Sequence, residues 1–181
     1  MNIGAEIPRP EGKSGKQVAR QRDVIDRRAL SEAIEKLIEE HGIAKARPQI
    51  LSLLQQALAD GRAEIGKRLM EKPSAGHNAA VEQSFLIDQL VRLIHDIAVK
   101  YQYPVNNPSS GERIAVMAVG GYGRGEMAPH SDVDIAFLTP FKQTSWTEQA
   151  VEAMLYWLWD LGLKVGQSSR SIDEMVHMAN E

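Results

Sequence analysis

The chain has 181 residues, of which 43% are hydrophobic and 25% are charged, and this ordinary globular composition argues against wholesale disorder. Its formal net charge is −3, so it lacks the basic surface that usually accompanies nucleic-acid binding. It has no cysteine, which excludes disulfides, thiolate nucleophiles and cysteine-based metal sites, so that any metal must be held by oxygen or histidine.

The N-terminal residues 1–17 mix proline, glycine, serine and lysine with few apolar side chains, and we expect them to form a flexible tail. They contain no hydrophobic region of the signal-peptide kind. No apolar run in the chain approaches the roughly 18 to 20 residues needed to cross a bilayer. We therefore expect a cytoplasmic location without a membrane partner.

The next part of the chain carries apolar residues at steps of three and four, the period of an amphipathic helix. Gly42 is expected to end the first helix, and Pro48 to begin the second. The pattern predicts three helices, at residues 18–40, 48–70 and 79–101. Residues 18–105 are thus predicted to be a helical N-terminal region.

After a loop the pattern changes to short apolar runs typical of buried strands. The segments "RIAVMAVG" and "DVDIAFLTP" are predicted strands with a glycine-rich turn between them, and "LKVGQSSR" is a predicted third strand. We expect an α/β (α+β) fold in which residues 106–181 form a small mixed sheet behind the N-terminal helices.

Two helices are predicted within this second part from capping boxes, in which a serine is followed three residues later by a glutamate. Ser145 with Glu148 is expected to open a helix that ends at Gly162. Ser171 with Glu174 is expected to open the last helix. The aromatic cluster at residues 156–159 is interpreted as core or partner-domain packing, because neighbouring side chains on a helix point to different faces.

Asp132 and Asp134 are the first candidates for chemistry. Alternate side chains of a strand face the same side, so the two carboxylates are expected to project together at the strand end. Their repulsion makes the arrangement unfavourable unless a cation lies between them, and such oxygen ligands suit Mg²⁺ or Mn²⁺. The alternative is a tight strand connection with two solvated acids.

The glycine-rich turn is the second candidate. Gly120 and Gly121 end a predicted strand, where a backbone without Cβ atoms can offer N–H groups to phosphate oxygens. Gly123 and Gly125 are expected to allow the turn backbone conformations that residues with a Cβ atom rarely adopt.

Three further features are expected to support phosphate binding beside this turn. A helical turn around residues 122–126 would add the positive end of its dipole. Arg124 could supply a charge for a triphosphate, and Ser131 a hydroxyl beside the metal.

The pair His95–Asp96 is interpreted as an ordinary helix-surface pair, and His130 as a loop residue that shapes the site.

The spacing Gly120-Gly121, ten residues, then Asp132-x-Asp134 resembles that of the DNA polymerase β-type nucleotidyltransferase superfamily. More narrowly, "GGYGRGEMAPHSDVDIAFL" and "LWDLGLKVGQSSRSIDE" are similar to segments of the bacterial protein-PII uridylyltransferases. That resemblance implies transfer of UMP from UTP to a tyrosine of the PII nitrogen-regulatory protein.

By the same resemblance, Asp132 and Asp134 would be the catalytic metal ligands. The nucleotide-binding set would be Gly120, Gly121, Tyr122, Gly123, Arg124, Gly125 and Ser131.

The family also uses a third carboxylate on a later strand, which we expect to follow the helix near Ser171 and to fall beyond Glu181. The HD domain that removes UMP and the ACT domains that sense glutamine have no counterpart in this sequence. We therefore expect a nucleotidyltransferase domain incomplete at its C-terminus and inactive by itself. The alternatives are a fragment that only binds a nucleotide or a partner, and an adenylyl- or aminoglycoside-type transferase.

Overall fold

The computed structural model describes residues 18–106, 109, 111–141 and 143–179, and the tail predicted at residues 1–17 lies outside them. The helices are α1 (Gln21–Val24), α2 (Arg27–His41), α3 (Ile43–Glu71), η1 (Pro73–Ala75), α4 (Gly76–Asp96), η2 (Ile97–Gln102), α5 (Gly120–Gly123), α6 (Ser145–Asp160) and α7 (Ile172–Ala179). The strands are β1 (Ala115–Ala118), β2 (Val133–Thr139) and β3 (Val165–Ser171). Within the described ranges, none of these helices has the length and apolar character needed to span a membrane.

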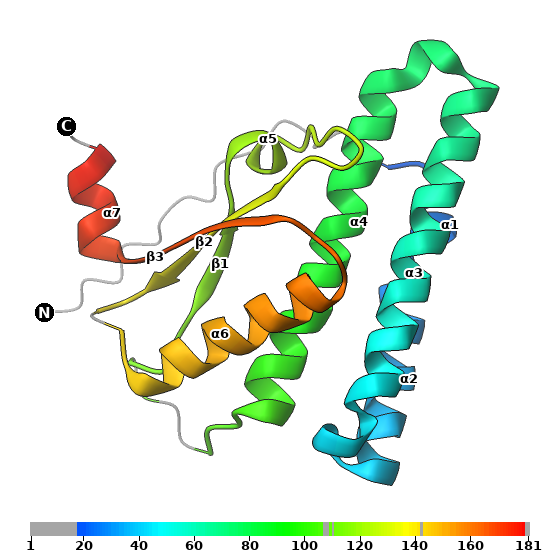
Figure 1. Cartoon of the computed structure of the whole chain (residues 1–181). Helices are drawn as coiled ribbons and strands as arrows, with labels where there is room; N and C mark the ends of the chain where they lie inside the picture. The colour runs from blue at the N-terminus through cyan, green and yellow to red at the C-terminus, as the bar shows by residue number, and fades with distance from the viewer. Residues whose placement is uncertain (1–17, 107–108, 110, 142, 180–181) are drawn as a thin grey trace, which may run out of the picture.

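The three strands form one sheet in the order β1-β2-β3, with β1 antiparallel and β3 parallel to β2. Figure 1 shows the hairpin of α2 and α3 on one side of the molecule and the sheet on the other, with α4 between them. The structure therefore confirms the predicted α/β fold with a small mixed sheet and preceding helices.

The first predicted helix, at residues 18–40, is wrong as a single element and is broken into α1 and α2. Asp26 accepts a hydrogen bond from the backbone N–H of Ala29 at 3.1 Å and so caps α2. Ile25 before it is extended. An aspartate that caps a helix competes with continuation of the helix before it, and the apolar period passes over this break unchanged. Gly42 follows α2 as predicted.

The predicted start of the second helix at Pro48 is also wrong, because α3 begins at Ile43 and contains Pro48. A single residue, Gly42, separates α2 from α3. Pro48 lies beyond the first turn of α3, so the helix loses one backbone hydrogen bond there because proline has no N–H. The apolar face shared with α2 outweighs this loss.

Helix α4 begins at Gly76, three residues before the predicted position, and continues through the π-helical turn η2 to Gln102. Its apolar stripe is fully buried, and α4 packs against both α3 and α6. The residues of this stripe with 0% exposure are Leu86, Ile87, Leu90 and Ile94. Helix α4 thus joins the helical hairpin and the sheet into one hydrophobic core.

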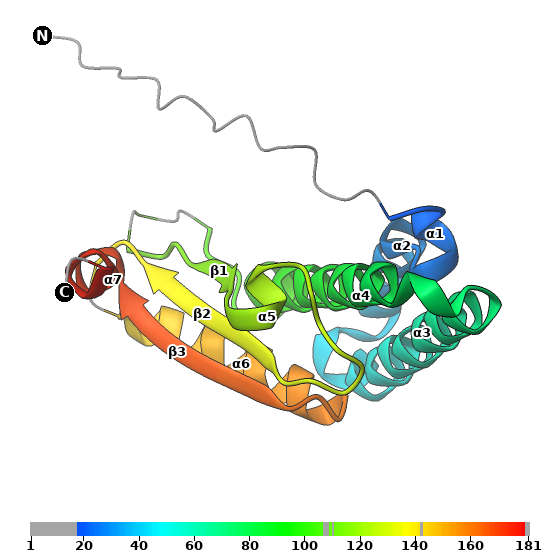
Figure 2. The same ribbon diagram turned by 90° about the horizontal axis from the view of Figure 1, so that it is seen from above.

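Helix α6 lies along one face of the sheet, as Figure 2 shows from above. The capping box at its start is formed by Thr144 and Thr147, so the predicted pair of Ser145 and Glu148 is wrong by one position. The Thr147 hydroxyl, at the third helical position, takes the role predicted for Glu148. The predicted box of Ser171 and Glu174 at α7 is confirmed by two hydrogen bonds of 2.8 and 3.2 Å.

The aromatic cluster on α6 is divided between core and surface. Trp157 is fully buried, donates a hydrogen bond to Gln102 at 3.0 Å, and lies under the guanidinium of Arg47. Tyr156 and Trp159 are about half exposed and contact each other edge to face. Core packing is therefore confirmed for Trp157, while packing of the two exposed side chains against a partner domain stays a prediction.

Candidate active site

The sheet register places three separate segments at one end of the sheet. The end of β1 meets the start of β2 because these strands are antiparallel, with Ala118 paired to Ile135. The start of β3 lies beside the start of β2 because these strands are parallel, with Gly166 paired to Asp134. The backbone N–H of Val119 donates to the carbonyl of Asp134 at 3.0 Å. This end of the sheet carries the candidate site.

The carboxylate of Asp134 lies between two glycine backbones. A Cβ atom added to Gly120 would lie 2.9 Å from its Oδ2, and a Cβ atom added to Gly166 would collide with its Oδ1. Gly120 also has a φ of +59°, a conformation that L side chains rarely adopt. The half-buried carboxylate therefore depends on the absence of side chains at Gly120 and at Gly166 of β3.

The glycine-rich turn is the four-residue helix α5, which begins at Gly120. Its first hydrogen bond runs from the N–H of Gly123 to the carbonyl of Val119 at 2.8 Å. The predicted position of the helical turn, at residues 122–126, is therefore wrong, because the turn begins two residues earlier, at Gly120. Four residues align too few peptide dipoles to act as the end of a long helix, so phosphate binding here would depend on individual N–H groups.

The other predicted residues surround this turn. Asp132 is exposed and directly precedes β2, two residues before Asp134. Ser131 and Arg124 are also exposed. The Arg124 guanidinium lies 3.9 Å from the position of a Cβ atom on Gly121, so it reaches back over the turn. Gly125 follows the turn with a φ of +67°.

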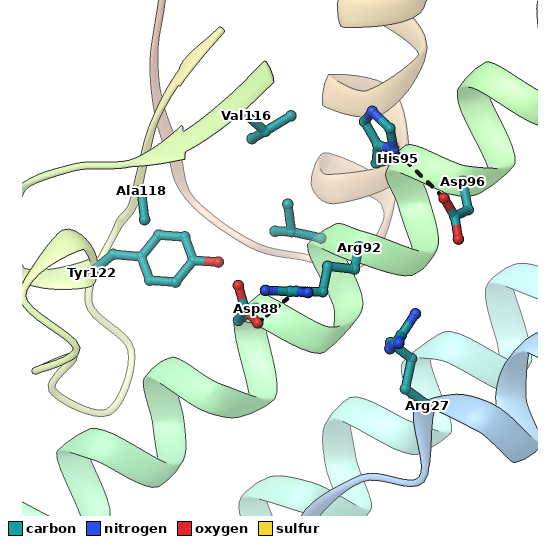
Figure 3. Close-up of a pocket in the computed structure, with 9 residues that line it drawn as sticks. Arg27, Asp88, Arg92, His95, Asp96, Val116, Ala118 and Tyr122 are labelled. Carbon is teal, nitrogen blue, oxygen red and sulfur yellow. Dashed lines mark hydrogen bonds and ion pairs between the residues drawn. The ribbon is translucent and has the colours of Figure 1, made fainter. Parts of the chain in front are cut away.

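Tyr122 differs from the other members of the predicted nucleotide-binding set. Its side chain is only 7% exposed and points toward α4, where it lines a cavity (Figure 3). Burial raises the pKa of its hydroxyl far above the ordinary value, Asp88 raises it further, and Arg92 opposes the shift. The backbone of Tyr122 belongs to the turn, while its side chain faces a different part of the molecule.

Sequence reasoning missed Gly166, which is as close to Asp134 as Gly120 is. A usable signal was present, because a glycine inside a strand pattern often marks the close approach of another group. The sequence could not name that group, since the partner of Gly166 is decided by the parallel register of β2 and β3.

The carboxylates of Asp132 and Asp134 are hard oxygen donors that fit Mg²⁺ or Mn²⁺, and the two glycines leave the room that the Asp134 carboxylate occupies. The described part of the chain holds no group of three histidine or acidic residues placed for a metal. Mg²⁺ is commonly held by one or two carboxylates together with substrate phosphates and water, so two protein ligands suffice for the fit.

The chain is similar to known proteins over most of its length. Residues 105–175 match the family model of the nucleotidyltransferase domain. The chain is 60% identical over 163 residues to the bifunctional uridylyltransferase/uridylyl-removing enzyme of Novosphingobium aromaticivorans, covering 90% of the chain and 18% of the relative. It is 59% identical over 165 residues to the same-named enzyme of Erythrobacter litoralis, covering 91% of the chain and 18% of that relative.

A more distant relative with the same name, from Rhodospirillum rubrum, is 46% identical over 166 residues, covering 90% of the chain and 18% of the relative. The chain thus spans about a fifth of the length of these curated relatives. No solved structure matches it. The resemblance seen in the sequence is confirmed: the chain carries a nucleotidyltransferase domain and is a homologue of the bifunctional uridylyltransferase/uridylyl-removing enzymes.

Proposed function

We propose that the protein is a metal-dependent nucleotidyltransferase that transfers UMP from UTP to a tyrosine of the PII nitrogen-regulatory protein. The observation that carries the proposal is the carboxylate of Asp134 between Gly120 and Gly166, with Asp132 two residues before it. The names of the related enzymes, which are uridylyltransferases, support uridylyl transfer. The acceptor follows from the resemblance of the glycine-rich segment to the protein-PII uridylyltransferases.

The turn and the strand end have separate roles in this proposal. The backbone N–H groups of Gly120 and Gly121 would donate to phosphate oxygens, and Arg124 would balance charge on the triphosphate. Asp132 and Asp134 would hold Mg²⁺ or Mn²⁺, which when bound neutralises charge that develops on the transferring phosphoryl group.

The reaction is an in-line displacement at phosphorus. The tyrosine oxygen of the acceptor bonds to the α-phosphorus of UTP, and the bond from that phosphorus to the bridging oxygen of pyrophosphate breaks. The tyrosine proton passes to water, and pyrophosphate leaves. The residues of this chain bind and align the triphosphate, which supplies much of the catalysis in phosphoryl transfer.

The test replaces Asp132 and Asp134 separately by asparagine, which preserves size and removes charge. Titration calorimetry with UTP and Mg²⁺ is the first readout, since transfer is expected to require a third carboxylate. Transfer of labelled UMP to PII, by a longer chain that also carries the third carboxylate, is the second. Each variant is expected to lose about 100-fold or more in transfer, equivalent to about 2.7 kcal/mol. Glu152→Gln, an exposed acid on α6, is the control.

The outcomes separate the alternatives. Unchanged transfer in both aspartate variants would refute the metal site. A preference for ATP over UTP would favour an adenylyl-type transferase. Binding of UTP with Mg²⁺ without any transfer to PII by the longer chain would favour a module that only binds nucleotide.

A further inference from the structure

A second polar cavity lies away from Asp132 and Asp134, between α4, the start of α2, and the edge of the sheet at β1 and α5 (Figure 3). Its volume is about 320 Å³, within the range of small-molecule sites. The polar side chains that line it come from segments far apart in the sequence: Arg27, Asp88, Arg92, His95, Asp96 and Tyr122.

This cavity is on the opposite face of the sheet from the candidate active site. Val116 and Ala118 line it, and they pair with Phe137 and Ile135 of β2. Asp134 alternates with those two residues and so projects from the other face. A ligand in the cavity would therefore be distinct from a nucleotide bound at Asp134.

The hydroxyl of Tyr122 is a hydrogen-bond donor that points into the cavity (Figure 3). The side chain is 7% exposed, and its hydroxyl has no hydrogen-bond partner among the residues that the structure describes. Burial raises its pKa, so the group remains protonated at neutral pH. Among the described residues, every fully buried side-chain nitrogen or oxygen has a hydrogen-bond partner, so this hydroxyl faces the open space of the cavity, where an acceptor atom of a ligand can reach it.

The carboxylates of the cavity are already matched by cations. Asp88 accepts from Arg92 at 2.8 Å, and Asp96 pairs with Lys100 at 3.1 Å. His95, interpreted from the sequence as a surface residue, is about one-third exposed, and its Nδ1 lies 3.6 Å from Asp96. The groups that remain to be satisfied are donors.

Arg27 differs from the other cationic side chains that line the cavity. It has no ion-pair partner in the described part of the chain, whereas its neighbour Arg28 pairs with Glu32 at 3.1 Å. Arg27 is the first residue of α2, whose first turn contains no acidic residue. The Asp26 carboxylate already caps this end of the helix, where it accepts from the N–H of Ala29 and lies 3.9 Å from Arg22, so the guanidinium of Arg27 is left for an anion in the cavity.

We propose that this cavity binds a small anion bearing a carboxylate or a phosphate group, held by the guanidinium of Arg27 and the hydroxyl of Tyr122. The inference goes beyond the proposed function and does not depend on it. Because Tyr122 belongs to the turn that begins at Gly120, occupancy of the cavity would also restrain that turn.

The test is a nuclear magnetic resonance titration of the uniformly ¹⁵N-labelled chain with inorganic phosphate in one arm and succinate in the other. Ionic strength is held constant with sodium chloride. The amide signals of Ala118, Tyr122 and Arg92 are expected to shift saturably with at least one anion. The arm that saturates at lower concentration identifies the preferred group.

Three variants decide the result. Tyr122→Phe removes only the hydroxyl, and Arg27→Gln changes an exposed side chain, so neither is expected to unfold the protein. Each should weaken binding at least fivefold, while the neighbouring control Arg28→Gln should leave it unchanged. Absence of saturable shifts with both anions, or equal weakening by Arg28→Gln and Arg27→Gln, would overturn the proposal.

Discussion

Two glycines show how the helical region differs from the sheet region. Gly61 on α3 makes room for the side chain of Leu86 and the backbone carbonyl of Val24, so it serves helix packing. Gly166 on β3 makes room for the carboxylate of Asp134, so it serves the candidate site. The same missing Cβ atom therefore contributes to stability in one region and to chemistry in the other. The two regions can be perturbed separately, although α4 joins them in one core.

The largest expected effect is on the stability contributed by the helical region. Leu86→Ala removes a side chain with 0% exposure from the contact between α3 and α4. The free energy of unfolding should fall by about 2–5 kcal/mol, because transfer and cavity costs add. Urea denaturation followed by circular dichroism measures it. Met70→Ala, at an 81% exposed position, is the control and should change little. A loss below about 1 kcal/mol for Leu86→Ala would contradict the assigned packing.

A second prediction compares two glycines on the same helix. In Gly61→Ala the new Cβ would lie 2.7 Å from the backbone carbonyl oxygen of Val24. Because backbone atoms cannot easily move aside, the free energy of unfolding should fall by about 1–3 kcal/mol. In Gly66→Ala the Cβ meets open space, so stability should rise by about 0.5–1 kcal/mol. Thermal and urea unfolding of both variants measure the difference. Effects of the same sign would show that α3 and α1 are not in close contact.

The third prediction addresses the sheet region. In Gly166→Ala the new Cβ collides with the free end of the Asp134 side chain, which can rotate away without moving backbone. Stability should therefore change little, while affinity for UTP in the presence of Mg²⁺ should fall by about tenfold or more, equivalent to about 1.4 kcal/mol. Calorimetry and urea denaturation measure the two quantities. Gly76→Ala, in open space on α4, is the control. Unchanged UTP affinity would contradict the role of Gly166 in positioning Asp134.

The smallest predicted effect appears only at alkaline pH. Burial raises the folded-state pKa of Tyr122 above its unfolded value near 10. Above that pH the unfolded chain releases the proton while the folded chain keeps it, so stability should decline as pH rises. The slope should reach about 1.4 kcal/mol per pH unit in the wild type relative to Tyr122→Phe. Urea denaturation between pH 8 and 11 measures the difference. If the free energy of unfolding changed with pH equally in the two proteins, the Tyr122 hydroxyl would be exposed to solvent in the folded state, which would contradict the prediction.

The helical region was largely predictable because its signals are local. The apolar period of α4 and the glycine after α2 each act within a few residues of chain. The two errors have different causes, one local and one tertiary. Asp26 caps a new helix inside an uninterrupted period, and Pro48 is tolerated within α3 because the contact with α2 outweighs a lost hydrogen bond.

The sequence by itself determined the succession of helices and strands, the glycine-rich turn, and the two aspartates at the strand start, since these depend on spacing along the chain. Only the tertiary structure decided that Gly166 approaches Asp134 and that the side chain of Tyr122 joins Arg27 in a cavity away from the turn. The physical reason is that strand register and helix packing are set by the burial of whole faces. The partner of any one residue is therefore chosen by the fold and not by its neighbours in the chain.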